Sequence, residues 1–280
     1  MRWARVSGRA WTVLTLALLT ALCLSWIYPF LWLVSASLKS PLGVFSQGLD
    51  LIPEGWRWDN YVRAWSVARF DLYMLNTVLV TLGTVFIVVV RSMLAGYVLG
   101  RYSFLGKRLI VGVLVATFIV PAGFTIIPVL DLSQRLGLVN NLWGVILALG
   151  GGGQVANILL FAGYFSQLPK ELEEAAILDG AGFLDVFFRV MLPLATPVTA
   201  TVTILTFLYA WNAFFVPLVF TFGRPELRTL AVGMLAFVGQ NETDWSGMSA
   251  AATLSLIPVV LVFFFAQRYI IEGISGAVKG

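Results

Sequence analysis

The chain has 280 residues, of which 59% are hydrophobic and 11% are charged, with a formal net charge of +4 and a mean hydropathy of +0.91. A soluble domain is nearer half apolar and a quarter charged, so the composition predicts a membrane protein. The sequence has no histidine, which removes the commonest general base and metal ligand, and one cysteine, Cys23, which excludes a disulfide within the chain. Lys and Arg lie mostly beside apolar runs, and this pattern does not indicate binding to nucleic acid.

Six apolar runs are long enough to cross a bilayer as helices, which takes about 20 residues each. They cover 13–36, 72–98, 109–130, 142–165, 196–220 and 249–269. Barrel strands are far shorter, so we expect an all-α polytopic protein with six transmembrane helices in one domain, 1–280. The start, "MRWARVSGR", could open a signal peptide, but the run after it lacks a small-residue cleavage site, which favours a retained first helix. Prolines within the runs, Pro121 among them, and the glycines of "LGGGGQ" at 149–154 predict kinks.

The flanks of these runs give the orientation, because Lys and Arg are enriched on the cytoplasmic side. Basic residues gather before the first run, after the second and after the sixth, at Arg2, Arg5, Arg9, Arg101, Lys107, Arg108, Arg268 and Lys279. The loop 39–71 balances four basic against four acidic residues and fits the outer side. We therefore expect both termini in the cytoplasm.

The loop 166–195, before the fifth run, breaks this charge pattern. Between Lys170 and Arg189 it has two basic and five acidic residues, a net charge of −3 on a side that should be positive. Contact with a partner would explain the acids, and so would a simply solvated loop, since Asp and Glu count little in topology. Charge alone leaves both readings open.

The spacing within this loop predicts two short helices along the membrane surface. Pro169 and the acids after it are typical of a helix start, and Gly180 is typical of a left-handed cap at its end. A second amphipathic helix is expected over 183–190, ended by Pro193, and Pro197 is expected to begin the next span. Small residues at the elbow, 179–181, would let another backbone come close.

The order of residues in this loop resembles the EAA loop of ABC-importer permease subunits. It reads "EAA", two residues, "DGA", eight residues, then Val190 and "LP". The resemblance extends over nearly the whole chain, through "YPFLWLVSASLKS", "LNTVLVT", "AGYVLGRYSFLGKR" and "LYAWNAFFVPL". The tail "QRYIIEGISGAVKG" is similar to the carbohydrate branch, specifically the smaller permease of maltose-type importers. Arg91 departs from the family, which is usually uncharged at this place.

The resemblance implies a type I ABC importer permease fold in a prokaryotic inner (plasma) membrane. The partners it implies are a second permease in a heterodimer, two ATPase subunits and an extracytoplasmic sugar-binding protein. This chain would be a non-catalytic subunit without a cofactor, with ATP and Mg on the ATPase subunits, and it has no G-x-x-x-x-G-K-[ST] pattern. Residues 171–182 would be the coupling helix that docks on the ATPase. The coupling residues carried over are Glu174, Ala175, Ala176, Asp179, Gly180, Ala181, Leu192 and Pro193.

Polar and aromatic side chains within the spans are candidates for a substrate path, because polar groups in a membrane are costly and often functional. They are Asn76, Gln154, Asn157, Tyr209, Trp211 and Asn212. Amides beside aromatic rings suit the hydroxyls and apolar faces of a sugar, whether oligosaccharide, disaccharide or amino sugar. Hydrogen bonding between helices and interfacial anchoring are the alternative roles. A glycerol phosphodiester or a polyol is the alternative solute, and the family resemblance implies that the partner permease can carry most contacts.

The outer loop 221–247 has a polar tip, "VGQNETDWSG". The resemblance implies that this tip, Gly239, Gln240 and Asn241, contacts the binding protein. Two other classes of protein fit less well. A proton-driven secondary transporter would usually need carboxylates within its spans, and an intramembrane enzyme would need a nucleophile with its base or a metal set.

Overall fold

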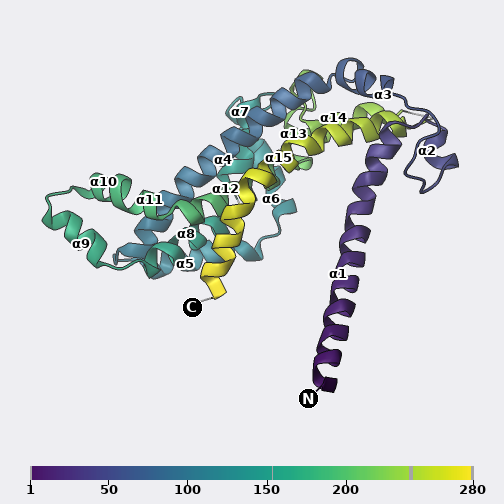
Figure 1. Ribbon diagram of the computed structural model, residues 1–280. Coiled ribbons are helices and arrows are strands. Elements are labelled where there is room, and N and C mark those ends of the chain that lie inside the picture. Colours follow the sequence, from purple (N-terminus) through teal and green to yellow (C-terminus); the bar gives the residue numbers. More distant parts are fainter. Residues whose placement is uncertain (1, 153, 240–241, 279–280) are drawn as a thin grey trace. The chain divides into compact units, whose positions relative to one another are not determined.

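The chain is helical wherever its structure is described. The computed structural model describes residues 2–152, 154–239 and 242–278, and within them the extended pairing is one isolated antiparallel bridge between Val238 and Thr243 (Figure 1). The all-α expectation is confirmed for this part of the chain. The helices form two compact units, one of residues 1–71 with 234–257 and one of residues 72–233 with 258–280.

Three helices are long and apolar enough to cross a membrane: α1 (Arg2–Ser37), α4 (Phe70–Arg101) and α15 (Trp245–Val278). Three further apolar segments are helix pairs bent by 109°, 52° and 73°, namely Lys107–Ile119 with Gly123–Arg135, Leu142–Gly151 with Val155–Gln167, and Phe183–Leu194 with Thr196–Trp211. The described residues therefore provide three to six spans. The shorter helices are α2 (Gly43–Ser46), α3 (Asp59–Val62), α5 (Lys107–Ala116), α6 (Ala122–Arg135), α7 (Leu142–Gly151), α8 (Val155–Gln167), α9 (Glu171–Leu178), α10 (Phe183–Asp185), α11 (Leu192–Leu194), α12 (Thr196–Trp211), α13 (Phe215–Phe220) and α14 (Leu230–Gly233).

The helices predicted over 109–130, 142–165 and 196–220 are not continuous, and the local sequence explains two of the breaks. Pro121 lacks an N–H and disfavours helical geometry at Val120, which is extended with ψ of 115°, so the first pair separates there. Gly152 is extended after α7, at the glycine run where a kink was expected. The third predicted helix is divided into α12 and α13.

The core of the 72–233 and 258–280 unit lies where α4 packs on α8. Gly96 and Gly100, one turn apart, make the contact close: a Cβ added at Gly96 would lie 2.4 Å from the Cβ of Phe161, and one at Gly100 would lie 2.6 Å from the carbonyl oxygen of Ala162. Small residues at this spacing let helix backbones approach. The surrounding buried cluster also contains residues that follow α9, among them Val186, Phe187 and Met191, so the loop 166–195 shares a core with α4 and α8.

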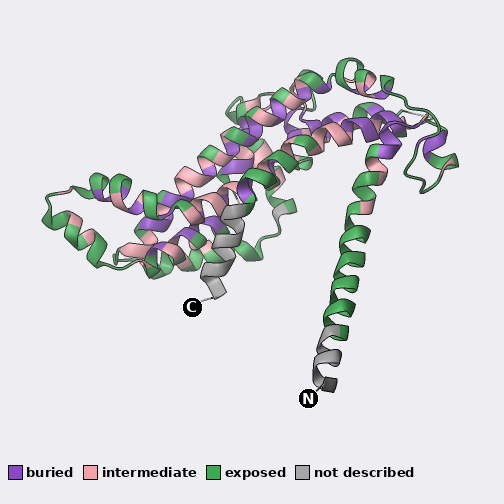
Figure 2. Cartoon of the chain, viewed as in Figure 1, coloured by how far each residue is buried: buried purple, intermediate pink, exposed green. Residues whose placement is uncertain are grey.

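In the unit of residues 1–71 and 234–257, the loop after α1 contacts the end of α1, through Asn60 and Ser37, and the start of α15, through Phe45 and Trp245. Figure 2 shows α1 exposed along most of its length and buried near Ala36. The ring centroids of Phe70 and Phe237 lie 5.7 Å apart. Lys39 is fully buried, and its Nζ donates a hydrogen bond to the carbonyl oxygen of Asp50 at 2.6 Å. The C-terminal end of α1 is thus held by this loop.

Candidate coupling loop and translocation path

Helix α9 ends in a glycine cap, as the sequence predicted. Gly180 has φ of +87°, in the left-handed region. Its N–H donates to the carbonyl oxygen of Ile177 at 3.0 Å, and the N–H of Ala181 donates to that of Ala176 at 2.9 Å. This pair of bonds is the Schellman motif, which satisfies the last carbonyls of a helix and turns the chain sharply. The chain then returns through α10 and α11 (Figure 1).

One side of α9 faces the protein and the other is open. Glu173 and Ala176 are half-buried, whereas Glu171, Glu174 and Ala175 are exposed. At the far end two apolar side chains are exposed, Ile177 at 60% and Leu178 at 87%. Of the other predicted coupling residues, Asp179, Gly180 and Pro193 are exposed, and Ala181 and Leu192 are half-buried against the core. The loop therefore presents acidic and apolar groups together on an open surface.

The prediction that Pro193 ends the second short helix is wrong. The helix continues as a π-helical stretch (Val186–Met191) and then α11 (Leu192–Leu194), so Pro193 lies inside it. A proline clashes with the carbonyl four residues earlier in a regular α-helix, and the widened turn before Pro193 relieves this contact. The bend comes at Ala195 instead, and Pro197 lies in the first turn of α12, as predicted.

Three residues in this region were missed as site residues from the sequence. Arg101, at the end of α4, forms an ion pair with Glu173 with Nη2 and Oε2 at 2.8 Å, and the Tyr97 hydroxyl donates to Oε1 of Glu173 at 3.0 Å. Tyr97 and Arg101 are four residues apart and so share a helix face. That spacing was a readable signal, but nothing in the sequence says which of three nearby glutamates they meet.

The polar residues at the break between α7 and α8 lie close together. Asn157 is 7% exposed, and its Nδ2 donates to Oε1 of Gln154 at 2.8 Å and contacts Oγ1 of Thr206 on α12 at 3.5 Å. Arg91 of α4 donates from Nη1 to the carbonyl oxygen of Gly151, the last residue of α7, at 2.5 Å. A cation at a helix C-terminus is favourable, so Arg91 has a structural partner at this break.

The other predicted path residues divide by exposure. Trp211 is 5% exposed and stacks on Phe207 with centroids 5.3 Å apart, while Tyr209 is 49% exposed. Asn212 is exposed, and its Nδ2 donates to the carbonyl oxygen of Leu208 in its own helix. Asn76 is buried, and its Nδ2 donates to the carbonyl oxygens of Glu226 and Arg228 at 2.8 and 3.0 Å. The structure thus gathers Gln154 and Asn157, and it gives Asn76 a place under the outer loop.

Of the predicted tip, the structure describes Gly239, which lies at the base of a small hairpin. The Val238–Thr243 bridge and a hydrogen bond from the N–H of Gly239 to the carbonyl oxygen of Glu242, at 3.0 Å, form its base. Gln240 and Asn241 lie outside the described residues.

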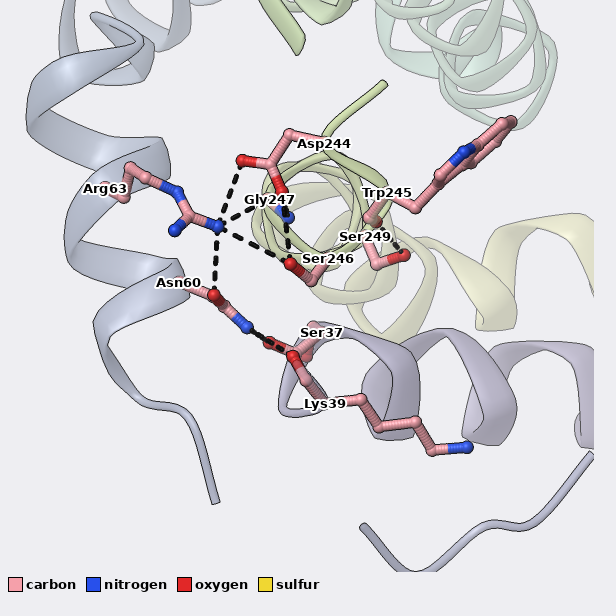
Figure 3. Close-up of polar contacts among 9 residues, drawn as sticks. All are labelled: Ser37, Lys39, Asn60, Arg63, Asp244, Trp245, Ser246, Gly247 and Ser249. Atoms are coloured by element: carbon pink, nitrogen blue, oxygen red, sulfur yellow. Dashed lines mark hydrogen bonds and ion pairs between the residues drawn. The ribbon is translucent and has the colours of Figure 1, made fainter. Parts of the chain in front are cut away.

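A polar cluster follows this hairpin at the start of α15 (Figure 3). Arg63 forms an ion pair with Asp244 at 3.0 Å, and its Nη2 also donates to Oδ1 of Asn60. Asn60 in turn donates from Nδ2 to the carbonyl oxygens of Ser37 and Lys39 at 2.8 and 2.9 Å. The base of the hairpin is therefore tied to the loop after α1 and to the end of α1. The sequence analysis did not identify this cluster.

Known proteins are similar to this chain in both sequence and fold. Residues 92–276 match the family described as "Binding-protein-dependent transport system inner membrane component". The chain is 34% identical over 276 residues to the diacetylchitobiose uptake system permease protein NgcG of Streptomyces coelicolor, covering 98% of this chain and 91% of that protein. It is 32% identical over 257 residues to the trehalose transport system permease protein SugB of Mycobacterium tuberculosis, covering 91% and 93%.

A solved structure supports the same similarity at the level of the fold. It is the crystal structure of a bacterial ABC transporter involved in the import of the acidic polysaccharide alginate. The two chains superpose with a TM-score of 0.82 at 26% identity, covering 94% of this chain and 97% of the other.

Proposed function

Since this chain belongs to the family of binding-protein-dependent transport system inner membrane components, we propose that it forms part of the path by which an ABC importer translocates a carbohydrate. The observation that carries the proposal is similarity over almost the whole chain to permeases named for sugar uptake, the diacetylchitobiose and trehalose systems. The amides of Gln154 and Asn157 at a break between spans agree with it, because such groups can bind hydroxyls. Trp211 and Tyr209 lie near the end of α12, the helix that also carries Thr206.

We infer that the coupling surface is α9 with the turn after it. In our account the exposed acids, Glu171 and Glu174, face basic side chains of an ATPase subunit, and Ile177 and Leu178 enter an apolar groove there. Apolar anchors beside charged groups are typical of protein interfaces. ATP and Mg²⁺ bind to the ATPase subunits, two per transporter, and this chain contributes no catalytic group.

The remaining partners follow from the same proposal. A second permease completes the membrane unit as a heterodimer, and the apolar surface of α1, which is exposed in this chain, is covered by that permease and by lipid. An extracytoplasmic binding protein delivers the sugar and contacts the loop tip of Gly239, Gln240 and Asn241. Both termini lie in the cytoplasm on this proposal, and the basic flanks support that orientation.

Transport by the reconstituted complex tests this function. The chain is purified with its partner permease and ATPase subunits, placed in liposomes, and supplied with a binding protein that a thermal-shift screen has matched to its sugar. We expect uptake of the labelled sugar that requires both ATP and the loaded binding protein. Uptake driven by a proton gradient without ATP would instead identify a secondary transporter, and a thermal shift with a glycerol phosphodiester alone would identify that solute.

A further inference from the structure

We propose that Arg101 is a positioning residue for coupling, which fixes the first turn of α9 to the cytoplasmic ends of α4 and α8. Movement of α9 by the ATPase then moves these two spans with it. The inference rests on the proposed coupling role of α9 and adds to it the joint through which the movement passes.

The ion pair between Arg101 and Glu173 is built into the protein interior. The Arg101 side chain is 3% exposed and that of Glu173 is 15% exposed. Two nitrogens of the guanidinium hold one carboxylate oxygen, with Nη2 at 2.8 Å and Nε at 2.9 Å from Oε2. Paired N–H donors to a carboxylate fix direction as well as distance, so this contact sets the orientation of the first turn of α9.

The same guanidinium also holds the end of α8. Nη1 donates to the carbonyl oxygens of Phe165 at 3.3 Å and Leu168 at 2.6 Å, and Nη2 donates to that of Pro169 at 3.4 Å. These carbonyls belong to the last turn of α8 and the residues that follow it, where the helix dipole favours a positive charge. One side chain thus joins α4, α8 and α9, and each of its nitrogens has an acceptor.

Tyr97, one turn before Arg101, extends the joint to the returning arm of the loop. Its hydroxyl donates to Oε1 of Glu173 at 3.0 Å, so both oxygens of that carboxylate are held from α4. The centroid of its ring lies 5.8 Å from that of Phe183 and 5.1 Å from that of Phe187, and both phenylalanines follow the turn at Gly180. Both arms of the coupling loop therefore rest on the last turn of α4.

The acidic residues of the loop divide into two roles on this account. Glu173 is turned inward to Arg101, while Glu171 and Glu174 are left on the open face for a partner. The second ion pair of the loop, Asp185–Arg189, is a useful contrast. Its side chains are 50% and 81% exposed and four residues apart in one helix, so it joins no separate elements.

The test uses the complete importer in lipid nanodiscs, with ATPase activity measured with and without sugar-loaded binding protein. We expect Arg101→Gln and Glu173→Gln to keep the ATPase subunits bound. The stimulation by loaded binding protein should fall by about 5- to 150-fold, the range of coupling between sites in proteins. Asp185→Asn, which breaks the exposed pair of the same loop, should leave the stimulation unchanged. Normal stimulation in both single variants overturns the proposal.

A double variant separates positioning from stability. Arg101→Met with Glu173→Leu replaces the buried pair by apolar groups, a change that proteins often tolerate without loss of stability. We expect the complex with this double variant to have the thermal midpoint of the wild type. The stimulation by loaded binding protein should stay low, because the hydrogen bonds from Arg101 to the end of α8 are absent. If the double variant regains both the wild-type thermal midpoint and the stimulation by loaded binding protein, the proposal is overturned. This outcome decides the question even if the single variants do not assemble. A wild-type complex without any stimulation overturns the proposed function itself, and this inference with it.

Discussion

Replacing Gly180 by alanine should weaken the hold of the permease on its ATPase. At φ of +87° the residue occupies the left-handed region, and an added Cβ would meet nothing within 4 Å. The added Cβ therefore meets no other residue, and the cost of the substitution is the local penalty that an L-residue's own Cβ brings in the left-handed region. An L-residue in this conformation costs about 1–2 kcal/mol.

That free energy acts on the population of the capped loop. A cost of 1–2 kcal/mol corresponds to a factor of about 5–30 in an equilibrium. If only the capped form presents Ile177 and Leu178 correctly, the apparent Kd for the ATPase subunit rises by up to this factor, in proportion to the loss of the capped form. Surface plasmon resonance of the ATPase on permease nanodiscs measures this Kd. Gly182→Ala is the matched control, because Gly182 has φ of −75° and the added Cβ comes no closer than 3.9 Å to Asp185.

Asparagine at the same position separates two causes. Asn tolerates the left-handed conformation better than alanine but carries a larger side chain. If backbone conformation sets the need for Gly180, Gly180→Asn binds more tightly than Gly180→Ala. Weaker binding for Gly180→Asn than for Gly180→Ala would show that close packing on the ATPase explains the need for glycine at this position. A Kd for Gly180→Ala equal to that for Gly182→Ala would refute the conformational reasoning.

Three other changes probe the remaining features of the chain. Glu174→Lys should weaken ATPase binding by about 30-fold or more in the same assay, because losing one partner of a buried, hydrogen-bonded interface charge pair costs about 2 kcal/mol or more; unchanged binding and transport would remove Glu174 from the interface. Gly96→Ala should lower the thermal midpoint of the complex in detergent, since it overpacks the contact of α4 with α8 by about 1–3 kcal/mol. Gly163→Ala, in open space on α8, should not lower it, and equal midpoints would contradict this packing. Arg63→Ala should speed amide exchange over 243–248 by up to about fivefold, because a half-exposed pair contributes about 1 kcal/mol or less; an unchanged rate would show that the pair does not hold the hairpin.

Much of the architecture could be predicted from the sequence, because apolar runs and glycine positions act locally. Three of the predicted apolar runs correspond to the long helices α1, α4 and α15, and Gly180 caps α9. Bends between helices were foreseen at Pro121 and at the glycine run, since both act on the backbone of their own neighbours. Pro193 was misjudged because a π-helical stretch absorbs it, and this widening depends on packing against the core.

The site was harder to predict because its contacts join residues far apart in the sequence. Glu173 looked equivalent to Glu171 and Glu174, and only the fold shows that it meets Arg101, 72 residues earlier. The sequence showed that Arg91 is an unusual charge within an apolar run. Its partner is a backbone carbonyl at the break after α7, and the sequence does not indicate which carbonyl a side chain will meet. The predicted coupling residues were chosen by family resemblance, whereas the structure shows which of them are buried and which are exposed.

Photo-crosslinking from Leu178 tests most directly whether α9 is the surface that receives the ATPase. Leu178 is 87% exposed on α9, and Leu42, 84% exposed in the loop after α1 and expected on the opposite side of the membrane, is the matched control. With a benzoylphenylalanine at each position in turn, the assembled transporter is irradiated with and without ATP. Our account predicts a covalent adduct with the ATPase subunit from position 178 and none from position 42. Adducts from position 42 but not from 178, or from neither position in a complex that transports sugar, would contradict it.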